Sequence, residues 1–278
     1  MASGKTLTLE NLTLKGGEAG TDDSSDPLAS SGGAIRLNGG SASLSKVTIS
    51  GCKATTTGGC TGQGGGIYAE DGGTLTLNNS TIKDCEATDS GGAIYATGGT
   101  INLTGCTITG CKAIKGGGIR LYKSGAGDAT LIISGGEIGG VWAGEPNTAS
   151  GTSGNGGGIY VEGSSCTVTL KDGAKITGNT ADEGGGIFAK GGSVELNSCT
   201  IKGNKGTLAG GGICARLNDS TPARVTINGG VIGGTSVSEA NTTTGSTGKG
   251  GGIFVSGANS AVTLSGTANV IGNTTEHE

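Results

Sequence analysis

The side chains of this sequence that could carry out acid–base chemistry are carboxylates, because the only histidine is His277. Carboxylates that converge on one face can cleave glycosidic bonds, and their oxygens also bind Ca²⁺. The clustered carboxylates are Asp22, Asp23 and Asp26, then Glu70 and Asp71, then Asp182 and Glu183. Because these groups stand in different repeats and mostly in turns, we expect them to be solvated and predict that the chain is not an enzyme.

Eight cysteines form the second set of reactive side chains. Cys52, Cys85 and Cys111 recur at equivalent places in three successive repeats, and stacked strands would bring their Cα atoms within disulfide range. A disulfide between Cys52 and Cys85 is therefore possible, although Cys111 would compete for the sulfur of Cys85. The alternative is that the thiols act as small buried hydrophobic side chains. Since no CxxC pair occurs, we expect no metal site and no cofactor.

A cassette, Gly-Gly-Gly-Ile or Gly-Gly-Ala-Ile, occurs eight times and must set the positions of these side chains. Its isoleucines are Ile35, Ile67, Ile94, Ile119, Ile159, Ile187, Ile213 and Ile253. A short cassette that recurs every few tens of residues is typical of stacked structural units. The intervals of 25 to 40 residues suit one β-coil of three short strands. We therefore predict an all-β parallel β-helix solenoid of about nine coils.

Apolar and polar residues alternate within each predicted strand. The coil at residues 91–111 contains the segments GGAIYA, GGTINLTG and CTITGC. In the middle segment Ile101 and Leu103 flank Asn102, which is the period-two pattern of a strand with one buried face. The other two segments show the same alternation. We therefore expect all three strands to direct aliphatic side chains toward one axis.

The residue after each cassette isoleucine is predicted to point away from this axis, because it is an arginine in two repeats. These candidate ligand-binding residues are Arg36, Tyr68, Tyr95, Arg120, Tyr160, Phe188 and Phe254, with Cys214 in the remaining repeat. Long loops at residues 17–31, 53–63, 143–155 and 236–249 lead into this outward column and would rim it. Exposed aromatic strips often bind partners or glycans. The alternative is that the rings only stack on one another beneath the loops.

A corner follows the third strand of each coil, and the residues there form a second predicted column. Its members are Gly17, Cys52, Cys85, Cys111, Val141, Asn179, Asn204, Thr235 and Asn273. Because like side chains would stack about 4.8 Å apart, the asparagines can hydrogen-bond from coil to coil and fix the register. We expect this corner column to be a structural ladder.

A longer repeat indicates how the chain is organised. Two blocks of three coils, residues 67–158 and 159–252, are 92 and 94 residues long, and their sequences resemble each other. We interpret residues 1–278 as a single β-helix segment. Strand-like sequence near both ends, without an amphipathic cap, leads us to expect a piece of a longer protein.

Charge and hydropathy argue against two kinds of partner. Eighteen Lys and Arg against 22 Asp and Glu give a net charge of −4, and no basic run occurs. We therefore expect no nucleic-acid binding. No stretch of about 18 apolar residues occurs, so we expect no direct membrane insertion of this segment. Self-association, end to end or side by side, stays an alternative.

The sequences GGAI at residues 32–35 and 91–94, ITGN at 176–179 and IKGN at 201–204 resemble the GGAI and FxxN repeats of chlamydial polymorphic membrane proteins. The resemblance covers nearly the whole chain, but aliphatic residues replace the phenylalanine of that repeat. It implies a right-handed parallel β-helix at the bacterial cell surface, as an extracellular autotransporter passenger or a similar adhesin segment. It also implies adhesion or display, with a host-cell protein or a glycan as the ligand.

Two other functions use the same fold. Polysaccharide lyases and hydrolases include β-helices, but the predicted outward arginines, Arg36 and Arg120, would lie three coils apart, roughly 14 Å. That separation is too large for joint contact with one sugar bond. Pairs such as Thr74 and Thr76 could form an ice-binding face, but Ile132 interrupts the threonine column, and threonine is a common strand residue. We therefore favour adhesion or display.

Overall fold

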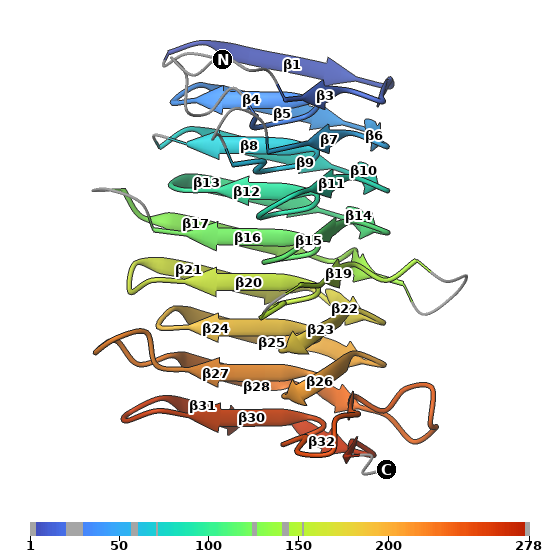
Figure 1. Cartoon of the computed structure of the whole chain (residues 1–278), viewed down its shortest axis with the longest axis vertical. Coiled ribbons are helices and arrows are strands. Elements are labelled where there is room, and N and C mark those ends of the chain that lie inside the picture. The colour runs from blue at the N-terminus through green and yellow to red at the C-terminus, as the bar shows by residue number, and fades with distance from the viewer. Residues whose placement is uncertain are drawn as a thin grey trace.

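Figure 1 shows the computed structural model of the chain as a stack of β-coils, with the N-terminus at one end and the C-terminus near the other. The structure describes residues 4–20, 30–56, 61–70, 72–123, 127–140, 145–151 and 153–275. These ranges contain no helix, and so none that is long and apolar enough to cross a membrane. Strands from successive coils pair in parallel in three sheets. The predicted all-β parallel β-helix is confirmed.

The eight cassettes form one sheet, here named sheet C. Its strands are β4 (Ile35–Asn38), β8 (Ile67–Glu70), β12 (Ile94–Ala96), β16 (Ile119–Tyr122), β20 (Ile159–Glu162), β24 (Ile187–Lys190), β27 (Ile213–Arg216) and β30 (Ile253–Ser256). Each cassette isoleucine pairs with the isoleucine of the next coil, as Ile67, Ile94 and Ile119 do. The cassettes are therefore in register along the whole stack.

The next two strands of each coil belong to sheet A, which has 16 strands. One row contains β1 (Thr6–Glu10), β5 (Ser41–Ser45), β9 (Thr74–Asn78), β13 (Gly99–Thr104), β17 (Ala129–Ser134), β21 (Cys166–Lys171) and β31 (Ala261–Ser265). The other row contains β2 (Thr13–Lys15), β6 (Thr48–Ser50), β10 (Thr81–Lys83), β14 (Thr107–Thr109), β18 (Glu137–Gly139), β22 (Lys175–Thr177) and β32 (Asn269–Ile271). The rows join because β25 (Ser193–Lys202) and β28 (Arg224–Gly233) run through both.

Each coil also has a fourth strand, which the sequence analysis did not separate from the corner. These strands form sheet B and are β3 (Glu18–Ala19), β7 (Lys53–Ala54), β11 (Glu86–Ala87), β15 (Lys112–Ala113), β19 (Thr148–Ala149), β23 (Thr180–Glu183), β26 (Lys205–Ala209), β29 (Thr242–Thr243) and β33 (Thr274–Thr275). Most are only two residues long, which is too short for an alternating pattern to be visible in the sequence. The structure contains nine coils, because sheet B has nine strands.

Aliphatic side chains fill the interior of the coil, here called the bore, as the alternation of apolar and polar residues predicts. In β17, Ala129, Leu131 and Ile133 are buried, whereas Thr130 and Ile132 between them are partly exposed. The buried residues of the inner coils join into one continuous cluster along the axis, and partly buried residues of the first and last coils, such as Leu9 and Val262, pack against it. Burial of one such side chain contributes about 1.5–3 kcal/mol, so the stack is stabilised along its whole length by the same kind of contact.

The glycines of the cassette are required because backbones of neighbouring coils approach closely there. A Cβ atom on Gly65 would lie 2.4 Å from the carbonyl oxygen of Gly92, and one on Gly92 would lie 2.2 Å from that of Gly117. No side chain fits at those distances. The first glycine, such as Gly91 with a φ of 64°, also adopts a left-handed conformation that favours glycine. The glycines of the cassette are therefore explained by the requirements of the fold.

The corner column is a hydrogen-bonded asparagine ladder in its C-terminal half. The amide of Asn179 donates to Oδ1 of Asn204 at 3.0 Å, and the amide of Asn204 donates to Oδ1 of Asn241 at 2.9 Å. The remaining members, Asn147 and Asn273, extend the ladder at its two ends with bonds of 3.0 and 2.9 Å. The predicted ladder positions of Asn179, Asn204 and Asn273 are confirmed.

Two members of the predicted corner column are not supported. Thr235 is exposed in a turn, and Asn241 occupies the corner of that coil instead. Val141 lies outside the described residues, and Asn147 occupies the corner there. In both coils more residues separate the third strand from the corner than in the other coils, so a fixed number of residues counted from the strand ends before the ladder residue.

Cysteines continue the same column above the ladder. The backbone N–H of Cys111 donates to Oδ1 of Asn147 at 3.0 Å, which repeats the bond between Asn179 and Asn204. Cys52, Cys85 and Cys111 are fully buried and have free thiols. The predicted disulfide between Cys52 and Cys85 is therefore wrong for this structure. Each thiol instead donates weakly to the carbonyl oxygen two residues earlier, so the column can stack without a covalent bond.

Candidate binding site on sheet C

The outward column predicted from the cassette exists as a continuous stack. Consecutive strands of sheet C pair its members in the order Arg36, Tyr68, Tyr95, Arg120, Tyr160, Phe188, Cys214 and Phe254. Tyr160, Phe188 and Cys214 form a cluster separate from the bore of the coil. The prediction that these side chains lie outside the bore is therefore confirmed.

The expectation that the column is an exposed strip is wrong. Tyr68 and Tyr95 are each 3% exposed, and Tyr160 and Phe188 are each 2% exposed. The rings of Tyr68 and Tyr95 stack with centroids 5.5 Å apart, and those of Tyr160 and Phe188 meet edge to face at 5.1 Å. Neighbouring members of the column therefore cover one another. The end members, Arg36 and Phe254, remain partly exposed.

Arg120 is the most enclosed charged residue of the column, at 6% exposure. Its guanidinium carbon lies 5.5, 4.9 and 5.2 Å from the ring centroids of Tyr95, Tyr122 and Tyr160. It also donates to Glu162 at 2.9 Å and to the hydroxyl of Ser90. Aromatic faces and a carboxylate together offset the loss of water around this cation. Arg120 thus joins the two aromatic parts of the column.

A second outward column lies two residues further along the same strands, and it carries most of the charge. In β20, β24 and β27 its members are Glu162, Lys190 and Arg216, which pair in register. Lys190 donates to Glu162 at 3.0 Å, on the carboxylate oxygen that Arg120 does not use. Arg216 makes two parallel bonds to Glu183, of 2.6 and 2.7 Å. The two carboxylates are therefore held by cations.

These contacts fix the protonation states of the charged groups. Burial raises the pKa of Glu162, but the hydrogen bond from Lys190 and the charge of Arg120 outweigh it and leave the pKa below its ordinary value. Burial lowers the pKa of Arg216, but the hydrogen bonds and charge of Glu183 outweigh it and leave the pKa above its ordinary value. Burial raises the pKa of Tyr95 to about 12. Glu162 and Arg216 are thus ionised at neutral pH.

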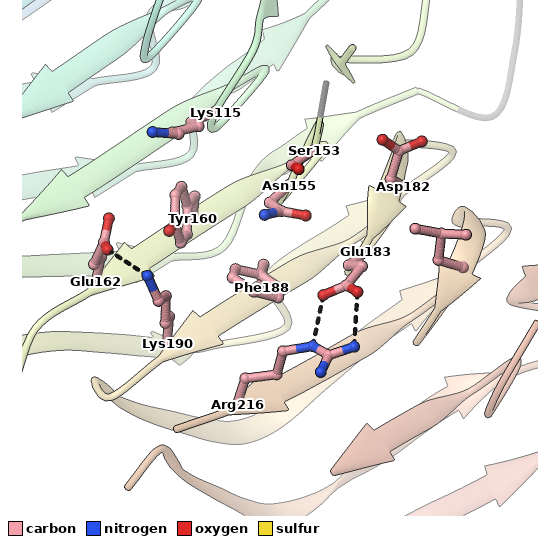
Figure 2. A pocket seen from close by; sticks show the side chains of 11 residues that line it. Lys115, Ser153, Asn155, Tyr160, Glu162, Asp182, Glu183, Phe188, Lys190 and Arg216 are labelled. Carbon is pink, nitrogen blue, oxygen red and sulfur yellow. Dashed lines mark hydrogen bonds and ion pairs between the residues drawn. The ribbon is translucent and has the colours of Figure 1, made fainter. Parts of the chain in front are cut away.

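A hollow of about 430 Å³ opens over these strands (Figure 2). Its lining combines ring edges, three carboxylates, three cations and a few uncharged groups: Lys115, Ser153, Asn155, Tyr160, Glu162, Asp182, Glu183, Phe188, Lys190, Leu208 and Arg216. Figure 2 shows the Glu162–Lys190 and Glu183–Arg216 pairs on either side of Phe188. The hollow is therefore a charged, partly aromatic site built on four successive coils.

Asp182 and Glu183 were expected to be solvated in a turn, and Glu162 was not among the predicted site residues. In the structure all three line the hollow. The signal that could have found Glu162 was the second outward position of each cassette strand, which carries Glu, Lys and Arg in successive coils. Of the predicted column, Tyr160 and Phe188 line the hollow. Arg36, Tyr68, Tyr95, Arg120 and Phe254 are not among its lining residues.

Other features of the described residues lie outside sheet C. Two adjoining hollows of about 480 and 280 Å³ lie over sheet B and share Lys112 and Ser150 in their linings. Within the described ranges, no group of three or more His, Cys, Asp or Glu side chains is arranged to hold a metal ion. Burial raises the pKa of Cys166 to about 12 and that of Cys199 to about 11, so these thiols stay protonated.

Residues 33–275 match the sequence model of the right-handed β-helix region family. This match covers most of the chain, and the protein belongs to that family. No curated protein and no solved structure matches the sequence. The family includes polysaccharide-cleaving enzymes and non-enzymes, so membership shows the fold and leaves the activity to be argued from the site.

Proposed function

We propose that this chain is a non-enzymatic binding segment, in which the hollow on sheet C binds a polysaccharide chain. The observation that carries this proposal is the arrangement of the hollow. Ion-paired carboxylates and cations surround the edges of Tyr160 and Phe188 on the rigid strands β20, β24 and β27. Rigid hollows that present several fixed hydrogen-bonding groups suit sugars, which carry many hydroxyl groups.

The charge states of the site favour binding over catalysis. A glycosidase needs one carboxylic acid with a raised pKa as its general acid. Glu162 has a lowered pKa, because Lys190 and Arg120 outweigh the effect of burial. A lyase needs a basic group that can accept a proton from the sugar ring. Arg216 cannot do so, because its contact with Glu183 raises its pKa further.

Polysaccharide cleavage is the second candidate function, and one observation favours it. Glu162, Asp182 and Glu183 converge on the same hollow, which the sequence did not indicate. A bound sugar chain that displaced Lys190 or Arg216 from its carboxylate would change the charge states described above. The activity assay below separates this candidate from simple binding.

The stack of coils also supports a role in display. Each coil contacts the next through backbone pairing and aliphatic layers, so the molecule is a stiff rod that can hold a binding site away from an anchor. We place this segment at the bacterial cell surface as part of a longer exported protein, because the repeat resembles those of surface adhesins. The partner is then a host-cell or neighbouring-cell glycan.

The test combines binding and turnover on the purified chain. We expect the protein to retain polysaccharides on a glycan array and to release neither reducing ends nor unsaturated uronides from those it binds. Release of either product would replace binding by catalysis as the function. Absence of binding to every neutral and acidic polysaccharide on the array would overturn the proposal.

A further inference from the structure

We infer that the hollow on sheet C selects an anionic polysaccharide, whose carboxylate or sulfate oxygens are bound by Lys115 and Asn155. This inference rests on the proposed function and specifies the chemistry of its ligand. In the hollow, the carboxylate oxygens already accept hydrogen bonds from the protein, whereas two of the side-chain donors have no partner in the protein.

The acceptors of the hollow are occupied. The oxygens of Glu162 accept from Lys190 at 3.0 Å and from Arg120 at 2.9 Å. Both oxygens of Glu183 accept from Arg216. Each of the six carboxylate oxygens thus accepts at least one bond from the protein, once those of Asp182 are included, which accept from Thr207 and from the backbone of Gly154.

The donors are not all occupied. Among the described residues, the side chains of Lys115 and Asn155 have no hydrogen-bond or ion-pair partner within the chain, and Figure 2 shows no bond to either. Lys190 uses one acceptor, on Glu162, although an ammonium group carries three N–H donors. Since buried or half-buried donors gain most from charged acceptors, a ligand with anionic oxygens satisfies this site better than one with hydroxyls alone.

The backbone that carries the two unpartnered donors is held in a fixed position. The backbones of Lys115, Asn155 and Glu183 pair as parallel bridges in three successive coils, directly before the cassettes. Lys115 and Asn155 are both partly buried, so their side chains project from anchored backbone rather than from a loose loop. Neighbouring coils are about 4.8 Å apart. The two donors can therefore contact one sugar unit or two adjacent units of a chain that runs along the axis.

Overall charge does not account for this selectivity. The whole chain carries a net charge of −4, and the lining of the hollow contains three cations and three carboxylates. Long-range attraction of a polyanion is therefore weak, and short-range hydrogen bonds must distinguish the ligand. We accordingly expect the affinity for an anionic polysaccharide to depend on individual side chains of the hollow and only moderately on the salt concentration.

The test measures the affinity of the full chain for polygalacturonate, for chondroitin sulfate and for neutral dextran by isothermal titration calorimetry. We expect one or both acidic polymers to bind and dextran to bind at least about tenfold more weakly, because a charge-assisted hydrogen bond is lost. The two acidic polymers distinguish carboxylate from sulfate as the group that is bound. Equal affinity for dextran would overturn the anionic inference and leave the proposed function intact. Absence of binding to all three and to the array would overturn both.

Four variants localise the effect. Lys115→Ala should weaken acidic-polymer binding by about tenfold. Its matched control, Lys83→Ala, removes the same charge from an exposed position on β10 in sheet A and should leave binding unchanged. Asn155→Asp changes little volume but places a carboxylate where the anion would bind, so it should weaken binding at least as much as Asn155→Ala. Acidic-polymer binding that survives both Lys115→Ala and Asn155→Asp, in variants that melt like the parent, would contradict the assignment.

Discussion

Arg120 and Glu162 lie in adjacent coils of sheet C, and the guanidinium of Arg120 donates to the Glu162 carboxylate at 2.9 Å. Their side chains are only 7% and 13% exposed. Lys190 reaches the same carboxylate from the next coil. This relationship couples three coils through one carboxylate, and Arg120 also lies over the ring of Tyr160, one of the two aromatic residues that line the hollow.

Glu162→Gln should destabilise the protein, because it leaves the buried Arg120 cation without its nearest carboxylate. We expect a loss of about 2 kcal/mol at pH 7, less than for a fully buried ion pair, because Glu162 keeps some contact with water. The pKa of Glu162 is lowered in the folded state, so its contribution is complete above the unfolded pKa and is lost as the pH falls through the folded pKa. Denaturant unfolding at pH 7 and near pH 3 should show a difference between the two proteins that shrinks in acid. A difference that grows in acid would contradict this account.

Asn204→Ala should be among the most damaging single changes at the corner. Asn204 is fully buried, and its side chain bonds to Asn179, to Asn241 and to the carbonyl oxygen of Ile176. Its removal leaves several buried polar groups unpaired, at a cost of roughly 3 kcal/mol. The control Asn102→Ala, on the outer face of β13, should change stability by less than about 0.5 kcal/mol. Chemical denaturation measures both, and equal losses would show that the ladder is not what fixes the corner.

Tyr95→Ala tests whether the outward column is structural. Tyr95 is 3% exposed and packs between Tyr68 and Arg120, so its loss should cost about 3 kcal/mol and lower the melting temperature. Tyr95→Phe keeps the ring and should be nearly neutral. Because Tyr95 does not line the hollow, the folded fraction of either variant should still bind polysaccharide. Loss of binding by Tyr95→Phe, with melting unchanged, would instead indicate that this part of the column contacts the ligand.

The buried thiols should be inert in the native protein. The seven cysteines that the structure describes are at most 3% exposed and have no disulfide partner: Cys52, Cys85, Cys106, Cys111, Cys166, Cys199 and Cys214. Alkylation with iodoacetamide, mapped by mass spectrometry, should modify these seven only after denaturation. Cys60 lies outside the described residues and carries no expectation. A native mass that is lower by the mass of two hydrogen atoms, together with a cross-linked peptide species that contains Cys52 and Cys85, would support the predicted disulfide and contradict this expectation.

The stacking of the cassettes could be predicted because it depends on local periodicity. The alternation around Ile94 specifies which side chains enter the bore, and the same rule places Tyr95 outside it. Exposure could not be predicted in this way. It depends on what the neighbouring coils place above and below each ring, and Arg120 in particular encloses Tyr95 and Tyr160 from a different repeat.

The corner and the hollow were harder to predict, for different reasons. Asn147 and Asn241 were missed because more residues separate them from the third strand than in the other coils, although they end the matching sequences EPN and EAN. The hollow was missed because Glu162 and Glu183 come from different coils and different sheets. Only the winding of the chain brings residues so far apart in sequence into one lining.

Because the hollow is assembled from four successive coils, its integrity depends on these coils and their immediate neighbours and little on the distant ends of the rod. A protease that cleaved the first coils, or a mechanical force that unfolded them, would shorten the molecule without disrupting the hollow. Recognition would fail only when the fraying reached β16 or β27. On the cell surface proposed for this segment, where shear and secreted proteases act, a binding segment that tolerates erosion in this way would be favoured.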